Sequence, residues 1–281
     1  MGHLSDPGPD NGTFTASSIK DSSKPADWKY SRAIALPSGY AAPPTIGVGL
    51  NSIDCGAKDG DNIRIQAEVS KITDKSFEVS VEKWNNSIFN DATLVWTESA
   101  QGAKDTKIGS WKIPKFQQKQ SEAIKFDTPF KEPPTIVLWF RKLDLTGAKN
   151  VTSWRVHTYA TDIKPEGFTV NIDTWNNNKL YSVVVTWIAI KKGKKNMHSG
   201  RFVEADGIAK LQKQKEKRVE FPEGLFKSRP TVLTGLSMID HPVENPIKLA
   251  SVVEDVSKDG FTWKMETGSD YACGADYIAI G

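Results

Sequence analysis

The chain has 281 residues, 38% of them hydrophobic and 10% aromatic, which is enough for two or three domains with real cores and excludes global disorder. Its 37 basic and 34 acidic residues give a net charge of +3, too small for the strong field that would indicate a nucleic-acid partner. Because no apolar run reaches the ~20 residues that a membrane-spanning helix requires, we expect no membrane insertion.

The first residues, MGHLSDPGPDNGTF, lack the basic and apolar regions of a secretory signal. We expect residues 1–29 to form a flexible leader that precedes the folded units. The two cysteines, Cys55 and Cys273, are far apart in the sequence, and such sparse use favours free thiols over a disulfide. The sequence therefore predicts a cytoplasmic protein; a secreted protein whose signal had been removed would show the same pattern.

A phrase of proline, threonine, an apolar stretch and a final aspartate occurs three times along the chain. The copies are APPTIGVGLNSID (42–54), EPPTIVLWFRKLD (132–144) and SRPTVLTGLSMID (228–240), which begin 90 and then 96 residues apart. Self-similarity at a nearly constant spacing is the signature of a repeated structural unit. The chain is therefore predicted to contain three copies of one unit.

Each copy continues with the same spaced frame. A turn closes at a phenylalanine, a basic residue stands thirteen positions earlier, and a tryptophan stands seven positions later in the first two copies. The third copy has lysine at the basic position and glycine at the tryptophan position. In chain order these positions are Arg64, Phe77 and Trp84; Arg155, Phe168 and Trp175; and Lys248, Phe261 and Gly268.

Within each copy the secondary-structure signals are those of strands. SFEVSVEKW and GFTVNIDTW alternate apolar and polar residues, and LYSVVVTWIAI is typical of a strand buried on both faces. The charged run at 210–221 aligns with 115–126 and is predicted to be a solvent-facing strand with its approach, not a helix. We predict an all-β fold of three tandem six-stranded antiparallel β-sandwiches, at 30–100, 101–194 and 195–281.

The sequence offers no recognisable catalytic or metal-binding set. The four histidines do not recur at equivalent positions, and no zinc-protease, serine-hydrolase, Cys-x-x-Cys or phosphate-loop motif occurs. We interpret His157 as a packing residue of a strand, and we expect no cofactor and no metal. The third copy has diverged most, and its unassigned candidates for acid–base chemistry are Asp240, His241, Glu254 and Tyr271.

An arginine, a tryptophan and an asparagine do recur together in the first two copies. An indole face packs against the C–H groups of a pyranose ring, while Arg and Asn supply directional hydrogen bonds to its hydroxyls. A tryptophan at the end of a strand can also be a cap of the core, and Asn-Asn is common in turns. The paired reuse of all three residue types favours carbohydrate binding, and the candidate site residues are Arg64, Trp84, Asn85, Arg155, Trp175 and Asn176. Trp96 and Trp187 are assigned to the core, because Tyr277 replaces them in the third copy.

This pattern resembles the H-type lectins, the family of the snail agglutinin and of the C-terminal domain of the discoidins. The matching text is PPTIVLWFRKLD followed by SWRVHTYATDIKPEGFTVNIDTWNNNKLYSVVVTWIAI, residues 133–190. The resemblance implies a six-stranded sandwich that assembles into trimers, with a site for galactose or N-acetylgalactosamine between neighbouring protomers. It also implies that Arg64 and Arg155 are the family's sugar-binding arginines, and Trp84 and Trp175 its stacking tryptophans.

Two departures from the family pattern concern that site. The residue after the tryptophan is often His in the family, and here it is Asn85 or Asn176. The family's upstream loop supplies a Gly and an Asp, whereas KFQQKQSEA and KLQKQKEKR have neither. Since the third copy also lacks the Arg and the Trp, its site is predicted to be lost or altered.

Three units in one chain suggest an intrachain pseudo-trimer. The linkers around ESAQGAKDTK and KKGKKNMHSG have about ten residues each, and an extended decapeptide reaches roughly 30 Å. Covalent linkage favours closure within the chain over association between chains. We therefore expect a monomer with internal three-fold pseudosymmetry that binds glycans or glycoconjugates without catalysis. The alternatives are a lyase or glycoside hydrolase with a site between two units, and a scaffold for protein contacts.

Overall fold

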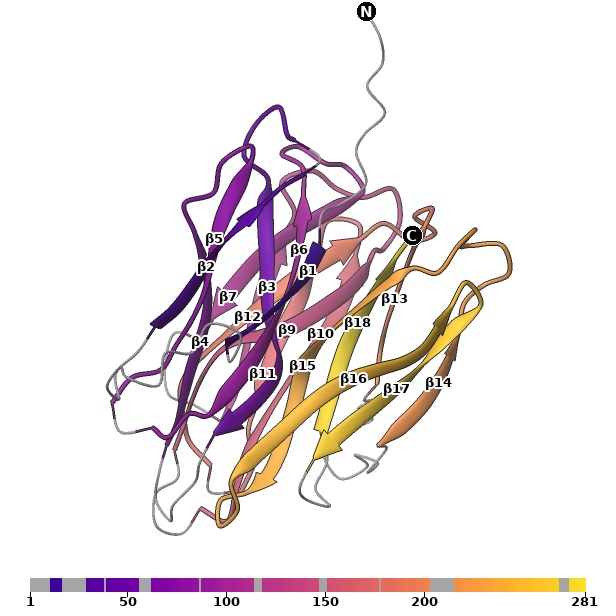
Figure 1. Cartoon of the computed structure of the whole chain (residues 1–281). Helices are drawn as coiled ribbons and strands as arrows, with labels where there is room; N and C mark the ends of the chain where they lie inside the picture. Colours follow the sequence, from indigo (N-terminus) through magenta and orange to yellow (C-terminus); the bar gives the residue numbers. More distant parts are fainter. Residues whose placement is uncertain are drawn as a thin grey trace, which may run out of the picture.

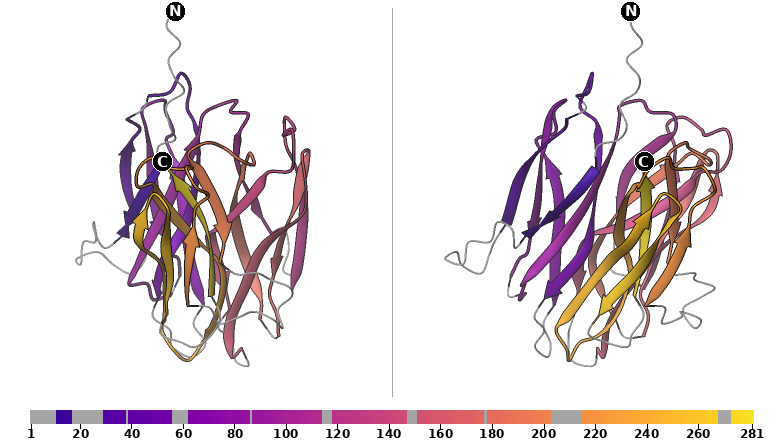
Figure 2. Two further views of the ribbon diagram at one scale, coloured as in Figure 1. Left: turned by 90° about the vertical axis from the view of Figure 1, so that its right-hand side faces the viewer. Right: turned by 45° about the vertical axis from the view of Figure 1, so that its right-hand side comes forward.

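The computed structural model describes residues 11–16, 29–37, 39–55, 62–85, 87–113, 118–146, 151–176, 178–202, 215–267 and 273–281. Within these ranges the chain is all-β and has no α-helix, and its strands lie as inclined layers side by side (Figures 1 and 2). The described residues form six strands for each of the three repeated units, so the predicted fold class is confirmed.

The strands of the first unit are β1 (Asn11–Thr15), β2 (Lys29–Ala35), β3 (Thr45–Cys55), β4 (Ile63–Ser70), β5 (Ser76–Glu82) and β6 (Asp91–Ser99). Those of the second are β7 (Thr106–Lys112), β8 (Lys119–Lys125), β9 (Thr135–Leu145), β10 (Ser153–Lys164), β11 (Gly167–Asp173) and β12 (Leu180–Ile190). The third unit has β13 (Met197–Arg201), β14 (Glu216–Glu220), β15 (Thr231–Pro242), β16 (Ile247–Ser257), β17 (Gly260–Thr267) and β18 (Cys273–Ile280).

Every six-stranded sheet is shared by two units. The orders are β1-β6-β3-β16-β17-β14, β13-β18-β15-β10-β11-β8 and β2-β5-β4-β9-β12-β7, and all pairings are antiparallel. Each unit therefore places its first, third and sixth strands in one sheet and its other three strands in another. The pairing is cyclic, because the first unit joins the second, the second joins the third, and the third joins the first.

We call the three inter-unit strand pairs seam 1–2 (β4 with β9), seam 2–3 (β10 with β15) and seam 3–1 (β16 with β3). All three have the same register. The basic residue of the repeated frame lies directly opposite the aspartate that ends the Pro-Thr phrase of the neighbouring unit. The opposed pairs are Arg64 with Asp144, Arg155 with Asp240, and Lys248 with Asp54.

The alternating strands bury one face, as their sequences predict. In β5 the residues Phe77, Val79 and Val81 are at most 1% exposed, while Ser76 and Glu78 between and beside them are partly exposed. The charged strand β14 pairs with β17 along its whole length, which confirms a strand for residues 216–220 of the run 210–221. Residues 210–214 lie outside the described part of the chain.

The leader prediction is wrong for residues 11–15. These residues form β1, which pairs with β6, and Phe14 is buried. The reason is a motif that begins each unit, a glycine followed two residues later by an aromatic ring. The glycine lies opposite the aromatic residue of the last strand, and a Cβ atom there would meet that ring. The three motifs are Gly12 to Phe14, Gly109 to Trp111, and Gly200 to Phe202, and they face Trp96, Trp187 and Tyr277.

The predicted extended linkers are also wrong. β6 continues to Ser99 and β7 begins at Thr106, so only a short turn joins the first two units. The second predicted linker, 191–200, contains most of β13. Its lysines are largely exposed, and Lys194 pairs with Asp105 at 3.2 Å, which ties the two turns together. Since each unit ends beside the strand that starts the next, no long span has to be bridged.

A second hydrophobic cluster lies where the three units meet, separate from the sandwich cores. At its centre is Trp139 of β9, which is fully buried and donates a hydrogen bond through Nε1 to the carbonyl oxygen of Asp276 at 3.1 Å. The equivalent positions in β3 and β15 are Gly49 and Gly235. A Cβ atom on either glycine would overlap the Trp139 side chain, so one indole fills the space around which three strands converge.

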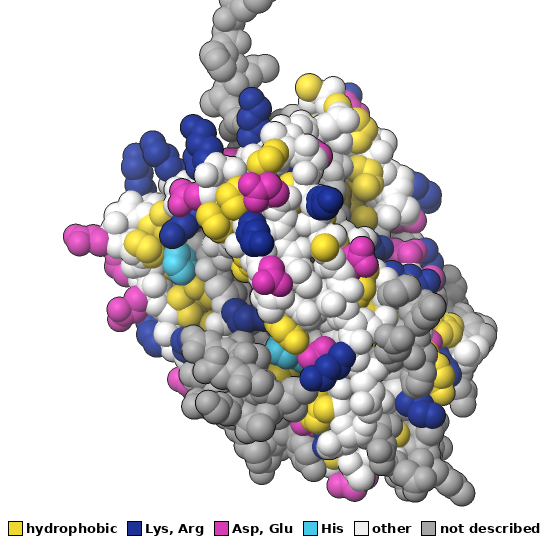
Figure 3. Space-filling model, turned by 180° about the vertical axis from the view of Figure 1, so that it is seen from behind, with side chains coloured by type: hydrophobic (Ala, Val, Ile, Leu, Met, Phe, Trp, Pro, Cys, Tyr) yellow, Lys and Arg dark blue, Asp and Glu magenta, His cyan; other side chains and the backbone are white. Residues whose placement is uncertain are grey.

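On the face shown in Figure 3, basic and acidic side chains are interspersed and hydrophobic ones occur in small groups, so no broad patch of one charge covers it. Both cysteines are free and buried, and burial raises their thiol pKa values to about 12. Among the described residues, no helix is long and apolar enough to cross a membrane, and no group of three or more His, Cys, Asp or Glu residues is placed to hold a metal ion.

Candidate functional site

The two Trp-Asn phrases form equivalent loops directly after β5 and β11. Trp84 and Trp175 are both half-buried, and the following Asn85 and Asn176 are exposed. These asparagines have φ angles of 55° and 57°, in the left-handed region that Asn tolerates better than most residues. The sequence therefore repeats Asn after Trp because the backbone turns there, and each turn leaves a partly exposed tryptophan and an exposed asparagine.

The loop of the second unit is anchored to the strand that carries Arg155. Thr174 donates a hydrogen bond through Oγ1 to the Arg155 carbonyl oxygen at 2.5 Å, and the Arg155 amide donates to Asn178 Oδ1 at 3.2 Å. Asn178 also donates to the Trp175 carbonyl oxygen at 3.3 Å, and Gln118 donates to the Asn176 carbonyl oxygen at 2.5 Å. The arginine and the tryptophan loop predicted from sequence are thus joined through the backbone.

The loop of the first unit is held differently. The buried ammonium of Lys83 donates to the carbonyl oxygen of Ser87 at 2.8 Å, and the Ser87 hydroxyl donates to the Asn62 carbonyl oxygen at 2.6 Å. The loop is therefore closed on itself and tied to the residue just before β4. Its tryptophan nevertheless occupies the same place relative to the seam.

Both arginines are engaged across a seam with an aspartate of the next unit. The Arg155 Nε atom donates a hydrogen bond to Asp240 Oδ1 at 3.1 Å, and its Nη2 atom donates to the Ser153 hydroxyl at 3.0 Å. Arg64 Nε lies 3.3 Å from Asp144 Oδ1. The sequence marked the arginines and the aspartates as repeated, yet it did not indicate that they pair, because the partners belong to different units.

The seam aspartates are perturbed by burial. The pKa of Asp240 and that of Asp144 are raised, because desolvation of each carboxylate outweighs the attraction of the opposing arginine. Their side chains are each 16% exposed, so neither residue is completely withdrawn from solvent. Such a carboxylate can accept a hydrogen bond from a hydroxyl group outside.

A lysine of the second unit completes seam 1–2. The Lys142 ammonium lies 4.5 Å from the centre of the Trp84 ring, a cation–π contact made from β9 across the seam. Lys142 is two residues before Asp144, so Trp84 and Arg64 both meet the same edge of the second unit. Met238 occupies the equivalent position in seam 2–3 and is fully buried.

Seam 2–3 carries a further polar group that seam 1–2 lacks. His157 is 1% exposed and stacks on Tyr159 at a ring distance of 5.0 Å, and the Tyr159 hydroxyl donates to Asp173 Oδ2 at 2.9 Å. Burial, with the nearby Arg201, lowers the pKa of His157 to about 3, so the ring is neutral at ordinary pH. The packing role predicted for His157 agrees with this position.

Comparison with protein families identifies the repeated unit. The H-type lectin domain model matches residues 31–97, 121–190 and 216–280, more than half of the chain. The chain belongs to the H-type lectin family. Among solved structures, wild-type discoidin II from Dictyostelium discoideum is similar over 52% of this chain and 73% of its own, with 12% identity and a TM-score of 0.28. A comparison with curated proteins finds no significant match.

Family membership makes carbohydrate binding the activity of this H-type lectin, and the three matches confirm three copies of the domain.

Seam 3–1 lacks the arginine and the tryptophan that the other two seams have. Lys248 is 79% exposed along its side chain and lies 4.0 Å from Asp54, at the limit of an ion pair. Gly268, which replaces the tryptophan, lies outside the described residues.

The residues considered for acid–base chemistry in this H-type lectin are not gathered at one point. Asp240 holds Arg155, and Glu254 lies in another sheet, paired with Lys264 at 2.6 Å. His241 is fully buried, stacks on Trp154 and donates through Nδ1 to the Pro242 carbonyl oxygen at 2.9 Å. Tyr271 lies outside the described part of the chain.

Proposed function

We propose that this H-type lectin binds galactose- or N-acetylgalactosamine-type glycans at seams 1–2 and 2–3, without catalysing a reaction on them. The observation that supports this proposal is the repeated pair of half-exposed tryptophans, each placed beside an Arg–Asp pair at the edge of the next unit. In each site a sugar ring stacks on Trp84 or Trp175, and Asn85 or Asn176 binds its hydroxyls.

The sequence suggested that Arg64 and Arg155 bind the sugar directly, whereas we propose that they position the seam aspartates. Since Arg155 is 8% exposed and committed to Asp240 and Ser153, it contributes chiefly by fixing the aspartate carboxylate. The carboxylate then accepts a hydrogen bond from the sugar. Arg64 and Asp144 do the same at seam 1–2.

We further propose that one chain forms the whole assembly in solution. Each sheet is completed by strands of two units of the same chain, so the pairing leaves no unit waiting for a second molecule. Light scattering with small-angle scattering tests this directly. A compact 31 kDa particle is the expected result, and a stable trimer of chains contradicts it.

Glycan-array binding followed by calorimetry with N-acetylgalactosamine and galactose tests the sugar sites. We expect two sites per wild-type chain, binding at least about fivefold weaker at the altered site in Trp84→Ala or Trp175→Ala, and weakened binding at both sites in the double variant, because loss of a stacking ring costs on the order of 1 kcal/mol or more. Ile163→Ala removes an exposed apolar side chain near the end of β10 that is remote from Arg155, and it is the control. A folded wild-type protein that binds no glycan, or a double variant that binds as well as wild type, contradicts the proposal.

A further inference from the structure

The two seams that carry a tryptophan loop differ at one position of the central strand. In seam 1–2 Lys142 lies opposite Gln66, and its ammonium is 4.5 Å from the centre of the Trp84 ring. In seam 2–3 Met238 lies opposite His157, which makes Met238 the equivalent of Lys142. Met238 is fully buried, whereas Lys142 is partly exposed. A cation in seam 1–2 therefore stands where seam 2–3 has an apolar side chain.

The charge of Lys142 is not balanced within its seam. The other three cations of seam 1–2 each lie near a carboxylate, whereas Lys142 has no carboxylate within ion-pair distance among the described residues. One positive charge thus remains beside the tryptophan. The balanced pairs are Arg64 with Asp144, Arg141 with Glu68, and Lys29 with Glu82.

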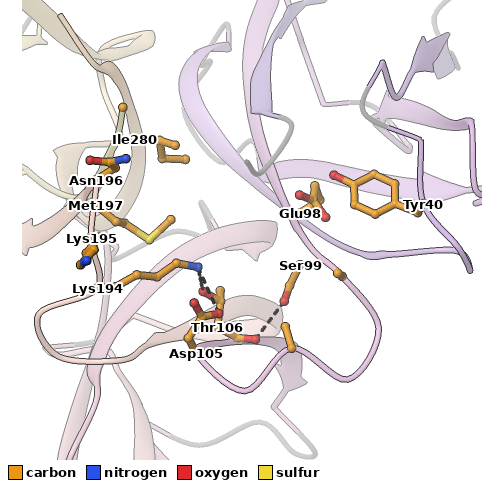
Figure 4. Close-up of a pocket in the computed structure, with 13 residues that line it drawn as sticks. Tyr40, Glu98, Ser99, Asp105, Thr106, Lys194, Lys195, Asn196, Met197 and Ile280 are labelled. Atoms are coloured by element: carbon orange, nitrogen blue, oxygen red, sulfur yellow. Dashed lines mark hydrogen bonds and ion pairs between the residues drawn. The ribbon is translucent and has the colours of Figure 1, made fainter. Parts of the chain in front are cut away.

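A lysine elsewhere in the chain shows what a satisfied ammonium looks like. Lys194 lies 3.2 Å from Asp105 Oδ1 and donates a hydrogen bond to Thr106 Oγ1 at 2.7 Å, beside the cavity drawn in Figure 4. Lys142 meets only the face of an indole, and none of its three N–H donors has an oxygen partner among the described residues. Because the four-carbon stem of lysine is flexible, this ammonium is able to leave the ring for an acidic group of a ligand.

The aspartates of the two seams are surrounded by different amounts of positive charge. Burial raises the pKa of Asp144, and Arg64 and Lys142 both act against that rise. Burial also raises the pKa of Asp240, and there Arg155 acts against it. An acidic group that enters seam 1–2 thus meets two cations around one carboxylate, so attraction exceeds repulsion.

We propose that the Trp84 site selects anionic sugars, galactose-type rings that carry a carboxylate or a sulfate ester, and that Lys142 binds the acidic group. This inference rests on the proposed sugar site at seam 1–2. A neutral ring that stacks on Trp84 has to displace the ammonium and gives nothing in return. An acidic ring replaces the same contact with a charge-assisted hydrogen bond. The Trp175 site, with Met238 at the equivalent position, has no such preference.

Calorimetry with matched sugars tests the selection in the full chain. A Trp175→Ala background, in which the other site is weakened, reports on the Trp84 site. The probes are methyl galactoside, methyl galacturonoside, and methyl galactosides sulfated at C3 or at C6, so a carboxylate and a sulfate ester are compared on one ring. We expect at least one acidic probe to bind about fivefold to tenfold more tightly than the neutral one. In a Trp84→Ala background the acidic probes should bind no more tightly than methyl galactoside.

Lys142→Met removes the charge and installs the residue type of seam 2–3, so it should abolish the preference while neutral galactoside still binds. Lys75→Met removes a lysine from the exposed turn between β4 and β5 and is the matched control, which should keep the preference. A preference that survives Lys142→Met overturns the assignment to Lys142.

The failure of this inference is distinguishable from the failure of the proposed function. Equal binding of neutral and acidic probes at the wild-type Trp84 site contradicts the selection of anionic sugars and leaves the sugar sites intact. A folded chain that binds no probe at either tryptophan overturns the sugar sites and this inference together.

Discussion

Seams 2–3 and 3–1 pair equivalent strands in the same register, and each has an aspartate at the equivalent position. The basic side chain that faces this aspartate differs between the two seams. In seam 2–3 Arg155 is buried and hydrogen-bonded to Asp240, whereas in seam 3–1 Lys248 is mostly exposed and 4.0 Å from Asp54. The ring of pairings closes in both cases. Strand pairing therefore joins the units, and the buried ion pair is a feature of the seams that also have a tryptophan loop.

The largest expected difference between the seams is in stability. Arg155→Ala leaves Asp240 with a buried charge and no opposing cation, and breaking such a pair costs about 3 kcal/mol in the free energy of unfolding. Lys248→Ala at the equivalent place removes an exposed contact and should change that free energy by less than about 0.5 kcal/mol. Chemical denaturation of both variants at pH 7 measures the contrast, and equal losses would show that the seams are held alike.

The buried His157 should make seam 2–3 sensitive to acid. Its pKa is lowered from 6.5 to about 3, so below pH 6.5 the unfolded chain binds a proton that the native chain does not. Stability is then lost as the pH falls, by about 1.4 kcal/mol per pH unit for this group between roughly pH 6 and 4. His157→Gln, which installs the residue type that Gln66 provides in seam 1–2, should remove this part of the slope.

Denaturation at pH 7, 6, 5 and 4 measures that slope. Burial lowers the pKa of His198 and that of His241 as well, and both remain in the variant, so a reduced slope is expected and not a flat one. An unchanged slope would mean that His157 takes up its proton in the native state.

Lys142→Met gives seam 1–2 the residue type of seam 2–3. Because the ammonium lies over Trp84, a neutral sugar ring has to displace a cation–π contact worth about 0.5–1 kcal/mol. The variant should therefore bind neutral sugars about twofold to fivefold more tightly at the Trp84 site. Calorimetry in a Trp175→Ala background isolates that site, and weaker binding would show that Lys142 helps to hold the sugar.

Gln118→Ala gives the smallest effect. Its side chain donates one hydrogen bond from an exposed position to the backbone of the Trp175 loop, and such a bond contributes about 1 kcal/mol or less. We expect binding at the Trp175 site to weaken by less than fivefold and binding at the Trp84 site to stay unchanged. A calorimetric titration of the variant in a Trp84→Ala background reads the first effect, and one in a Trp175→Ala background the second.

The strands and the number of units follow from the sequence because alternation and the repeated frame are local signals. The Gly-x-aromatic motifs at Gly12, Gly109 and Gly200 are also present in the sequence. The need for glycine becomes clear only when the structure shows which aromatic ring lies opposite it. The pairing of Arg155 with Asp240 was out of reach for a similar reason. A basic residue and an aspartate recur at these positions in every unit, and no local sequence signal indicates that the basic residue of one unit pairs with the aspartate of the next.

The single indole at the centre has a consequence for how such a gene can change. A homotrimer must place one residue type three times around its axis, so it could hold neither one tryptophan with two glycines nor three tryptophans in that space. Once Trp139, Gly49 and Gly235 had become different, no single unit could leave the chain and rebuild the ring from copies of itself. Deleting a unit would leave the packing short, and duplicating the middle one would supply a second indole with no room. The packing around Trp139 therefore disfavours both the loss and the duplication of a unit during evolution.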